Sequence, residues 1–235
     1  MEITYRFKYK FKNHNSLLFI TGTPFCGKST IASVIASLIK DCVYQSMDII
    51  RLIAQLLEKT KAKNIRNRFV ELGCCEGYTL IDNGAYSPNN LIKGYHIYSK
   101  SLFSIIKYII SKLEFQGVEN VLFEGVQLMP SLVYQYLDNK NKLIVITSNT
   151  QHLIKNREKR FGKDKELTEK YSIDKLLFLQ KEILRQSEKI PRHKLFIIEN
   201  QDNYENTVYQ ILQFLQKTNV ITPFSLYDKM LISKA

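Results

Sequence analysis

Short apolar runs alternate along the chain with longer segments in which apolar residues recur every three or four positions. The runs, at 17–21, 43–47, 120–123, 143–147 and 195–198, have the length and composition of buried strands. The longer segments, at 28–40, 49–59, 91–115, 174–189 and 204–217, have the periodicity of amphipathic helices. Strands that alternate with helices predict an α/β fold, with a five-stranded parallel sheet and helices on both of its faces.

The first residues of the chain follow a different pattern. Over residues 2–12, Ile, Tyr and Phe alternate with Thr, Arg and Lys, and a period of two is typical of a strand. We interpret residues 1–15 as an N-terminal extension that contains an extra edge strand, whose lysines oppose edge-to-edge aggregation. The alternative is a basic strip that binds nucleic acid with the help of its interleaved aromatic side chains.

Composition narrows the class of protein. Hydrophobic residues make up 45% and charged residues 24% of the 235 residues, which is ordinary for a globular chain and argues against disorder. No apolar stretch reaches the roughly 18 residues of a membrane span, and the first residues lack the apolar segment of a secretory signal. Without repeats or Pro- and Gly-rich linkers, we expect a single domain over residues 1–235.

The net charge and the cysteines add less. A formal charge of +12 suits a polyanionic partner such as nucleic acid, but Lys, Asn and Ile all have AT-rich codons, so genome composition is an equal explanation. The cysteines show no CxxC spacing, and we expect no zinc site. They are Cys26, Cys42, Cys74 and Cys75. An adjacent pair is poorly placed to bridge itself, so free thiols and a cytoplasmic location are the natural inference.

One motif carries specific chemistry. The run GTPFCGKST fits GxxxxGK[ST] and lies between a predicted strand and a predicted helix, the context that a phosphate-binding loop (P-loop) requires. Glycine torsions aim amide N–H groups at the phosphates, and the helix N-terminus adds partial positive charge. We expect the whole run to bind ATP: Gly22, Thr23, Pro24, Phe25, Cys26, Gly27, Lys28, Ser29 and Thr30. The motif therefore predicts a three-layer P-loop NTPase fold.

Within this run, three side chains have distinct expected roles. Lys28 is predicted to reach the β and γ phosphates, and Ser29 to give its hydroxyl to Mg²⁺. Thr30 is predicted to support the first helical turn near the α phosphate. These roles make ATP and Mg²⁺ the expected cofactors.

Two carboxylates follow strands at the same edge of the predicted sheet. Glu124 ends the apolar run VLFE, and Asp48 follows the run at 43–47. Because ligands bind outside the carboxyl ends of parallel strands, Glu124 is predicted to hold a Mg²⁺-bound water. Asp48 is predicted to accept the proton of an attacking hydroxyl, and a helix N-cap is an alternative or additional role for it.

Cations near these carboxylates are candidates for binding the acceptor and the phosphoryl group. Arg51 lies one helical turn after Asp48, on the same helical face, where it either clamps an anionic acceptor group or is a plain surface residue. The region of about 150–172 is predicted to be a lid whose cations close over the transferring phosphoryl group. A solvated basic helix is the alternative for these residues: Arg157, Lys159, Arg160 and Lys163.

Six segments spread over most of the chain carry a family resemblance: GTPFCGKST, SMDIIRLI, GYHIYSK, VLFEGVQLMP, EKYSIDKLLFLQKEILRQSEK and IIENQDNYENTV. Together they resemble the 2-phosphoglycerate kinase family, P-loop kinases related to the nucleotide kinases. The first segment is generic, whereas the fourth is similar to the family's EGVHLVP pattern. The resemblance implies a helical acceptor region, at about 60–115, a mobile lid, and ATP-dependent phosphorylation of 2-phosphoglycerate.

The resemblance also implies roles for single residues. It assigns Asp48 and Arg51 to the acceptor side, Glu124 to the metal, and Arg157 with Arg160 to the lid. Gln127 stands where the family has histidine, and the family's serine-rich acceptor motif has no clear counterpart in YTLIDNGAYSPNN. A neutral amide hydrogen-bonds a hydroxyl or carboxylate but lacks the charge of a protonated imidazole. We therefore expect the acceptor of the phosphoryl group to be a small phosphorylated or carboxylated metabolite, which Arg51 and a pocket that includes Gln127 bind.

Two other functions stay open besides that of a metabolite kinase. The sequence does not indicate an oligomeric state for any of these three functions. A D-x-x-R motif behind a P-loop is similar to polynucleotide 5′-hydroxyl kinases, in which the aspartate acts as base and the arginine holds a neighbouring phosphate. A non-catalytic regulator, in which ATP orders a lid and changes partner affinity, is the other function. The polar residues at 200–203 are candidates for base recognition or simple turn formers.

Overall fold

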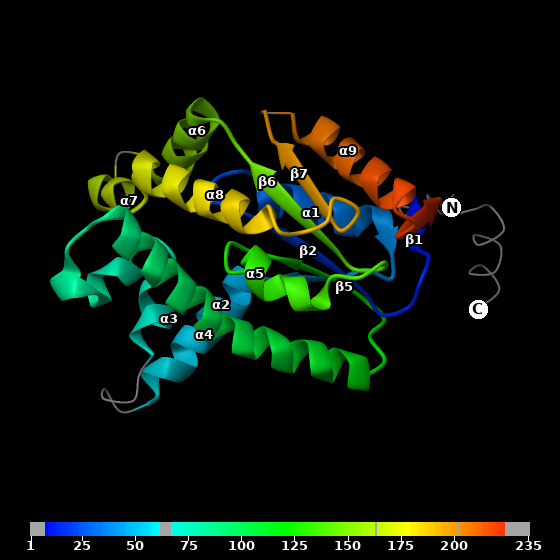
Figure 1. The fold of residues 1–235 in the computed structure, drawn as a ribbon, viewed down its shortest axis with the longest axis horizontal. Coiled ribbons are helices and arrows are strands. Elements are labelled where there is room, and N and C mark those ends of the chain that lie inside the picture. The colour runs from blue at the N-terminus through cyan, green and yellow to red at the C-terminus, as the bar shows by residue number, and fades with distance from the viewer. Residues whose placement is uncertain (1–7, 62–66, 163, 202, 224–235) are drawn as a thin grey trace, which may run out of the picture.

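The protein's structure, a computed structural model, describes residues 8–61, 67–162, 164–201 and 203–223. Five strands form a wholly parallel central sheet in the order β4-β5-β2-β6-β7 (Figure 1). The strands are β2 (Ser16–Gly22), β4 (Val43–Ser46), β5 (Asn120–Glu124), β6 (Lys142–Thr147) and β7 (Leu195–Glu199). Each lies where a buried apolar run predicts it, so the α/β fold with a five-stranded parallel sheet is confirmed.

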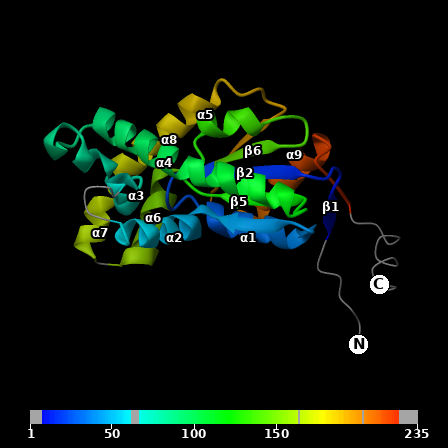
Figure 2. The same ribbon diagram turned by 90° about the horizontal axis from the view of Figure 1, so that it is seen from below.

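Helices cover both faces of this sheet, as predicted. On one face α1 (Lys28–Leu38) packs with α9 (Tyr204–Lys217). On the other, α8 (Ile173–Ser187) packs against both α4 (Pro88–Phe115) and α5 (Pro130–Val133). Figure 2 shows α1 and α5 on opposite sides of the strands. The middle strand, β2, is therefore buried along its whole length.

The remaining helices lie in or next to the regions predicted for the acceptor side and the lid. α2 (Met47–Lys59) follows β4 directly and precedes the predicted acceptor-side region of about 60–115, in which α3 (Arg68–Leu72) lies between α2 and α4. α6 (Thr150–Phe161) and α7 (Lys165–Lys170) follow β6, in the predicted lid region of about 150–172. Short 3₁₀ turns complete the chain, at Gly77–Leu80, Asp82–Gly84 and Tyr134–Tyr136. The sequence pattern does not reveal α3, α5 or α7, because each is too short for a helical period to show.

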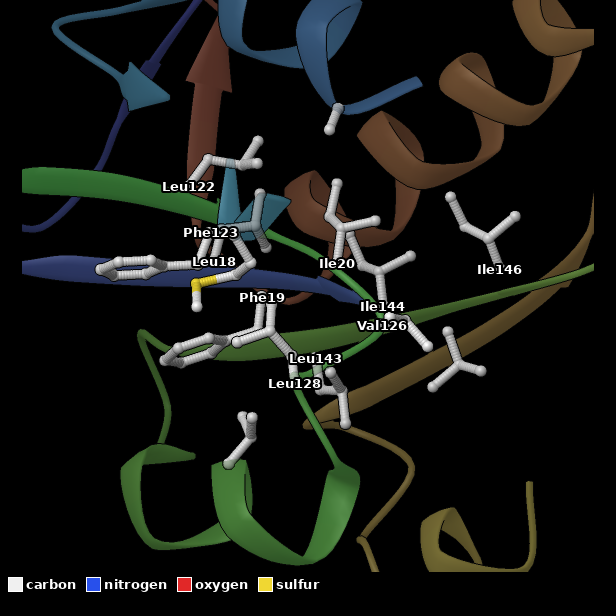
Figure 3. Packing of buried hydrophobic residues seen from close by; sticks show 14 of the residues in the cluster. Leu18, Phe19, Ile20, Leu122, Phe123, Val126, Leu128, Leu143, Ile144 and Ile146 are labelled. Carbon is white, nitrogen blue, oxygen red and sulfur yellow. The ribbon is translucent and has the colours of Figure 1, made fainter. Parts of the chain in front are cut away.

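Strand register brings the ends of three strands together. Glu124, the last residue of β5, is level with Ile20 of β2 and with Ser46, the last residue of β4. Behind this edge, interleaved side chains of β2, β5 and β6 fill the core, with Phe19 stacked on Phe123 at 5.8 Å between ring centroids (Figure 3). The packed core thus fixes where the carboxyl ends of the strands lie.

The N-terminal strand differs from its prediction. The described part of that segment, β1 (Tyr9–Phe11), is not an edge of the five-stranded sheet but the middle strand of a second sheet. It pairs in parallel with β3 (Ile39–Lys40) and antiparallel with β8 (Ile221–Pro223). Partner strands of two and three residues leave no readable apolar run, so the sequence pattern does not predict them. Residues 2–7 of the predicted strand lie outside the described residues.

Two further features are absent from the described residues. None of the helices there has the length and apolar character of a membrane span. No cluster of three or more His, Cys, Asp and Glu side chains in the same ranges has an arrangement that holds a metal ion.

Candidate functional site

The P-loop lies where β2 ends and α1 begins. A Cβ atom on Gly22 would lie 2.2 Å from the carbonyl oxygen of Ile146, so only glycine fits beside β6. Gly27 has a φ of 87° and occupies the N-cap of α1, where it provides no side-chain cap, and the first turn of α1 contains no acidic residue. The partial positive charge of the helix N-terminus is therefore not neutralised by the helix itself, which suits an anion such as phosphate.

Asn200 holds the P-loop through a side-chain hydrogen bond. Its side-chain amide donates a hydrogen bond to the carbonyl of Cys26 at 3.0 Å, and its own backbone N–H donates to Thr147 at 2.9 Å. A Cβ on Gly27 would lie only 2.4 Å from the Asn200 amide nitrogen. Asn200 is 3% exposed and bonded to the P-loop backbone, so of the two roles considered for residues 200–203 the structure favours a structural one at Asn200. Asn203 likewise caps α9 by accepting a hydrogen bond from the backbone of Asn206.

A buried carboxylate faces the first turn of α1. Glu124, 1% exposed, accepts hydrogen bonds from the Ser29 hydroxyl at 3.1 Å and from the Tyr44 hydroxyl at 3.1 Å. The ammonium nitrogen of Lys28 lies 3.7 Å from the same carboxylate. Burial by itself lowers the Lys28 pKa, but the Glu124 charge opposes this effect, and the net Lys28 pKa is above its ordinary value. Lys28 therefore carries its positive charge at neutral pH.

Tyr44 is a member of this group that the sequence does not reveal. It lies on β4, next to β5, so strand pairing rather than any motif brings it to Glu124. Burial and then the neighbouring Glu124 carboxylate raise the Tyr44 pKa. Its hydroxyl thus stays protonated and donates to Glu124.

Asp48 and Arg51 lie side by side on α2, as their spacing predicts. Asp48 falls in the first turn, whereas the N-cap is Ser46, so the helix-cap interpretation of Asp48 is wrong. The Asp48 side chain is 50% exposed, and its carboxylate oxygen is 4.0 Å from Nε of Arg51. A half-exposed carboxylate is accessible to a proton donor in the adjacent cavity.

Gln127 holds Asp48 rather than facing the cavity. Its amide nitrogen donates to the Asp48 carboxylate at 3.2 Å and to the Tyr98 hydroxyl at 2.7 Å. Gln127 is fully buried, and it is not among the described residues that line the cavity. Its Oε1 atom is buried without a hydrogen-bond partner in the described structure. The sequence predicts that Gln127 contacts the acceptor directly. The structure corrects this prediction, because Gln127 instead supports Asp48.

The P-loop, α2 and the predicted lid region border one cavity of about 560 Å³. The P-loop, from Pro24 to Thr30, forms one wall, and α2 contributes Asp48 and Arg51 to a second. The lid forms a third wall, which includes Lys159 and Arg160 of α6. A volume of this size is typical of a small-molecule site.

Aromatic contacts join the lid to the P-loop. The Phe25 ring meets Phe161 of α6 edge-on at 5.4 Å between centroids and Tyr171 at 5.5 Å. The Asn156 side chain donates to the Phe25 carbonyl at 2.9 Å. The region predicted to be a lid thus packs against the P-loop in this structure.

Of the predicted lid pair, the structure brings one arginine to the cavity. Arg160 lines the wall, whereas Arg157 is not among the described lining residues and donates weakly to the Tyr171 carbonyl at 3.4 Å. Nε of Arg157 is buried with no partner in the described ranges. Lys163 lies outside the described residues.

Two adjacent cysteines lie at or next to the cavity. Cys74 lines the cavity, and its sulfur lies 3.7 Å from that of Cys75. The hydrogen bond between them lowers the Cys74 pKa and raises the Cys75 pKa. Both are free thiols, in agreement with the expectation from the sequence.

Comparisons with known proteins give likenesses of shape alone. No family model and no curated protein matches the sequence. Among solved structures, a shikimate kinase from Acinetobacter baumannii is 14% identical (TM-score 0.49; 86% of this chain, 93% of that chain), and a thymidylate kinase from Candida albicans is 10% identical (0.48; 91% and 97%). An uncharacterized protein from Eubacterium ventriosum is 10% identical (0.46; 86% and 99%). At these values the likenesses carry no argument about activity or substrate.

Proposed function

We propose that the chain is an ATP-dependent phosphotransferase that moves the γ-phosphoryl group of MgATP to a hydroxyl of a small anionic metabolite. One observation carries this proposal. Lys28 and Ser29 of the P-loop lie within 3.7 Å of the Glu124 carboxylate, and the Asp48 and Arg51 pair lines the same cavity. A nucleotide site and an acceptor site would thus share one cavity.

The residues present suit MgATP. Mg²⁺ prefers oxygen ligands and is commonly held by one or two protein oxygens together with phosphates and waters. The Ser29 hydroxyl and the Glu124 carboxylate, 3.1 Å apart, are such oxygens, with Ser29 as direct ligand and Glu124 as the holder of a bound water. The charged Lys28 would exchange its contact with Glu124 for the β and γ phosphates. When bound, MgATP supplies the phosphoryl group and a divalent charge that neutralises it.

On the acceptor side, the side chains fit a proton transfer and a charge clamp. Asp48 accepts the proton of the attacking hydroxyl, with Gln127 holding its carboxylate in place through the 3.2 Å hydrogen bond. Arg51, 25% exposed at the cavity wall, binds an anionic group of the acceptor. Arg160 from the lid neutralises phosphoryl charge, and Arg157, whose Nε lacks a partner in the described structure, joins it when the lid tightens.

A small anionic acceptor is favoured by the shape and charge of this space. The cavity has the volume of a metabolite site, and the lid covers it next to the P-loop. We name 2-phosphoglycerate as the first candidate, because its phosphate and carboxylate offer Arg51 an anion next to a free hydroxyl. The family resemblance of the sequence supports the same choice.

The test is transfer of labelled γ-phosphate from ATP in parallel to 2-phosphoglycerate, a panel of phosphorylated and carboxylated metabolites, and 5′-hydroxyl RNA and DNA oligonucleotides. We expect label on a small metabolite, and none with Lys28→Ala, while the exposed-site control Lys100→Ala retains full activity. Label on oligonucleotides alone, with binding that weakens steeply as salt rises, would show a polynucleotide kinase instead. Tight MgATP binding without transfer to any acceptor would favour a nucleotide-binding regulator.

A further inference from the structure

One face of α2 exposes large aliphatic side chains along its whole length. At 100° per residue these side chains form one continuous arc of about 140° on the helix surface, which borders the buried Ile50 and leaves out Asp48 and Arg51. They are Ile49 (60% exposed), Leu52 (56%), Ile53 (55%), Leu56 (65%) and Leu57 (58%), and we call them the α2 stripe. Single exposed apolar residues are common, but five neighbours on one helix mark an interaction surface.

The other faces of α2 have occupants in the described structure. Asp48 and Arg51 line the cavity, and Gln55 donates to the carbonyls of Val70 and Glu71 at the α3 end. The α2 stripe, by contrast, lies on the outer surface of the molecule, where α2 forms part of its outline (Figure 2). The large exposed apolar side chains of α2 are therefore confined to the α2 stripe, whereas the polar side chains of Asp48, Arg51 and Gln55 line the cavity or contact α3.

We propose that the α2 stripe is the interface of a homodimer, in which α2 packs antiparallel against α2 of a second copy across a two-fold axis near Ile53. A two-fold interface must be self-complementary, because each copy presents the same surface. The stripe meets this condition, because Ile53 is its midpoint and the pairing places Ile49 of one copy beside Leu57 of the other. Aliphatic residues spaced by three and four positions are also the pattern with which one helix packs against another.

Charge supports a second copy as the occupant. Two chains of charge +12 repel each other, but α2 itself carries Asp48, Arg51, Glu58 and Lys59, whose formal charges cancel. All five residues of the α2 stripe are aliphatic, and Arg51 lies outside the stripe at the cavity wall. Two copies can therefore meet along α2 with little local repulsion, although the remainder of each chain is basic.

The same features argue against two other occupants. A helix that lies on a lipid surface has a polar face rich in Lys and Arg and often carries Trp or Phe anchors, whereas α2 is neutral and has no aromatic residue. The second alternative is that residues 224–235, which lie outside the described structure, cover the stripe. These residues follow β8, and β8 pairs with β1, away from the carboxyl-end edge of the sheet where α2 begins (Figure 1). The place where the described chain ends therefore does not favour this segment.

The first experiment measures the mass of the full chain in solution by sedimentation or light scattering at micromolar concentration. We expect the wild-type mass to be twice that of the chain. The double variant Leu52→Glu/Leu56→Glu places charges in the seam and should weaken the dimer by at least about 100-fold in Kd, with unchanged circular dichroism because both positions are exposed. Tyr108→Glu, a 62% exposed site on α4, is the matched control and should remain dimeric.

A second experiment locates the axis. Ile53→Cys should form a disulfide-linked dimer under mild oxidation, whereas wild type and Tyr108→Cys should remain monomeric on a non-reducing gel. A wild-type monomer overturns the proposal: binding to anionic lipid vesicles would then identify a membrane surface, and dimerisation only after removal of residues 224–235 would identify that segment as the occupant. A wild-type dimer that survives Leu52→Glu/Leu56→Glu places the interface elsewhere and also overturns it. None of these outcomes depends on kinase activity.

Discussion

The Ser29 hydroxyl donates a hydrogen bond of 3.1 Å to the Glu124 carboxylate, 95 residues further along the chain. One residue comes from the first turn of α1 and the other from the end of β5, and the pairing of β5 with β2 brings them together. Since the P-loop connects β2 to α1, the same sheet that forms the core also sets this distance. Packing of the sheet thus determines the geometry of the candidate metal site.

Replacing Glu124 tests this site. Glu124→Gln keeps the shape but removes the charge that would hold a Mg²⁺-bound water, so the Mg²⁺ concentration for half-maximal turnover should rise about 10- to 100-fold. A Mg²⁺ titration of phosphoryl transfer at saturating ATP measures it. Glu205→Gln, at an exposed position on α9, is the control. An unchanged Mg²⁺ requirement would remove Glu124 from the metal site.

Asp48→Asn separates chemistry from binding. The amide cannot accept the hydroxyl proton, so kcat should fall about 10²- to 10⁴-fold while ATP affinity stays within about twofold of wild type. Because Ser46 and not Asp48 is the N-cap of α2, the variant should keep its cap and lose only the small stabilisation, about 0.3–1 kcal/mol, that the helix dipole gives a first-turn carboxylate. Steady-state kinetics with the labelled-transfer assay, alongside the exposed-site control Asp174→Asn, measures the effect. Full activity of Asp48→Asn would exclude the general-base role.

The sequence predicts those parts of the site that are local in the chain. The glycines, Lys28 and Ser29 form a contiguous motif, and Asp48 and Glu124 directly follow apolar strands, so their common edge can be inferred. Tyr44 and Asn200 reach the site through partners 80 and 174 residues away, and no local pattern carries such pairings. For the same reason the sequence places β1 at an edge, because its partners β3 and β8 are too short to detect.

Asn200→Ala should loosen the P-loop without touching a ligand. The Cys26 carbonyl would lose the hydrogen bond that holds it at 3.0 Å, an interaction typically worth about 0.5–1.5 kcal/mol. We expect ATP affinity to fall by roughly two- to tenfold, with little change in the turnover rate at saturating ATP. Isothermal titration with a non-hydrolysable ATP analogue measures the affinity. Asn203→Ala removes only the α9 cap, so equal losses in both variants would point to general destabilisation instead.

An ion network around the buried carboxylate of Glu182, between α4 and α8, predicts an acid-dependent stability. Burial raises the pKa of Glu182, but hydrogen bonds from Arg185, Gln186 and His96 lower it to about 2, below its ordinary value of 4.5. A depressed carboxyl pKa stabilises the folded state above the unfolded value and loses this contribution as pH falls from about 4.5 toward 2. Urea unfolding between pH 6 and pH 3 should therefore show falling stability.

The variant Glu182→Gln checks the cause of that acid dependence. It should be less stable than wild type at pH 6, because Arg185 and His96 lose their charged partner, and its stability should fall less steeply below pH 4.5. Glu188→Gln, just past the end of α8, is the control and should follow the wild-type curve. Parallel curves for Glu182→Gln and wild type would assign the acid dependence to other carboxylates.

The contact of Phe161 with Phe25 predicts how the lid opens. Phe161→Ala removes the contacts of the Phe161 ring with Phe25 and Tyr171. Aromatic pairs are worth about 0.5–1.5 kcal/mol each, so losing both should lower the closed-to-open ratio of the lid about 5- to 100-fold. Trypsin has many sites in the basic stretch from Lys155 to Lys170. Cleavage there should be faster in Phe161→Ala than in wild type. An ATP analogue plus acceptor should slow cleavage of wild type by closing the lid and should protect the variant less.

Phe115→Ala, an 87% exposed site on α4, is the control and should behave as wild type. Equal cleavage rates with and without ligands in all three proteins would mean that α6 and α7 do not open, and the lid assignment would fail.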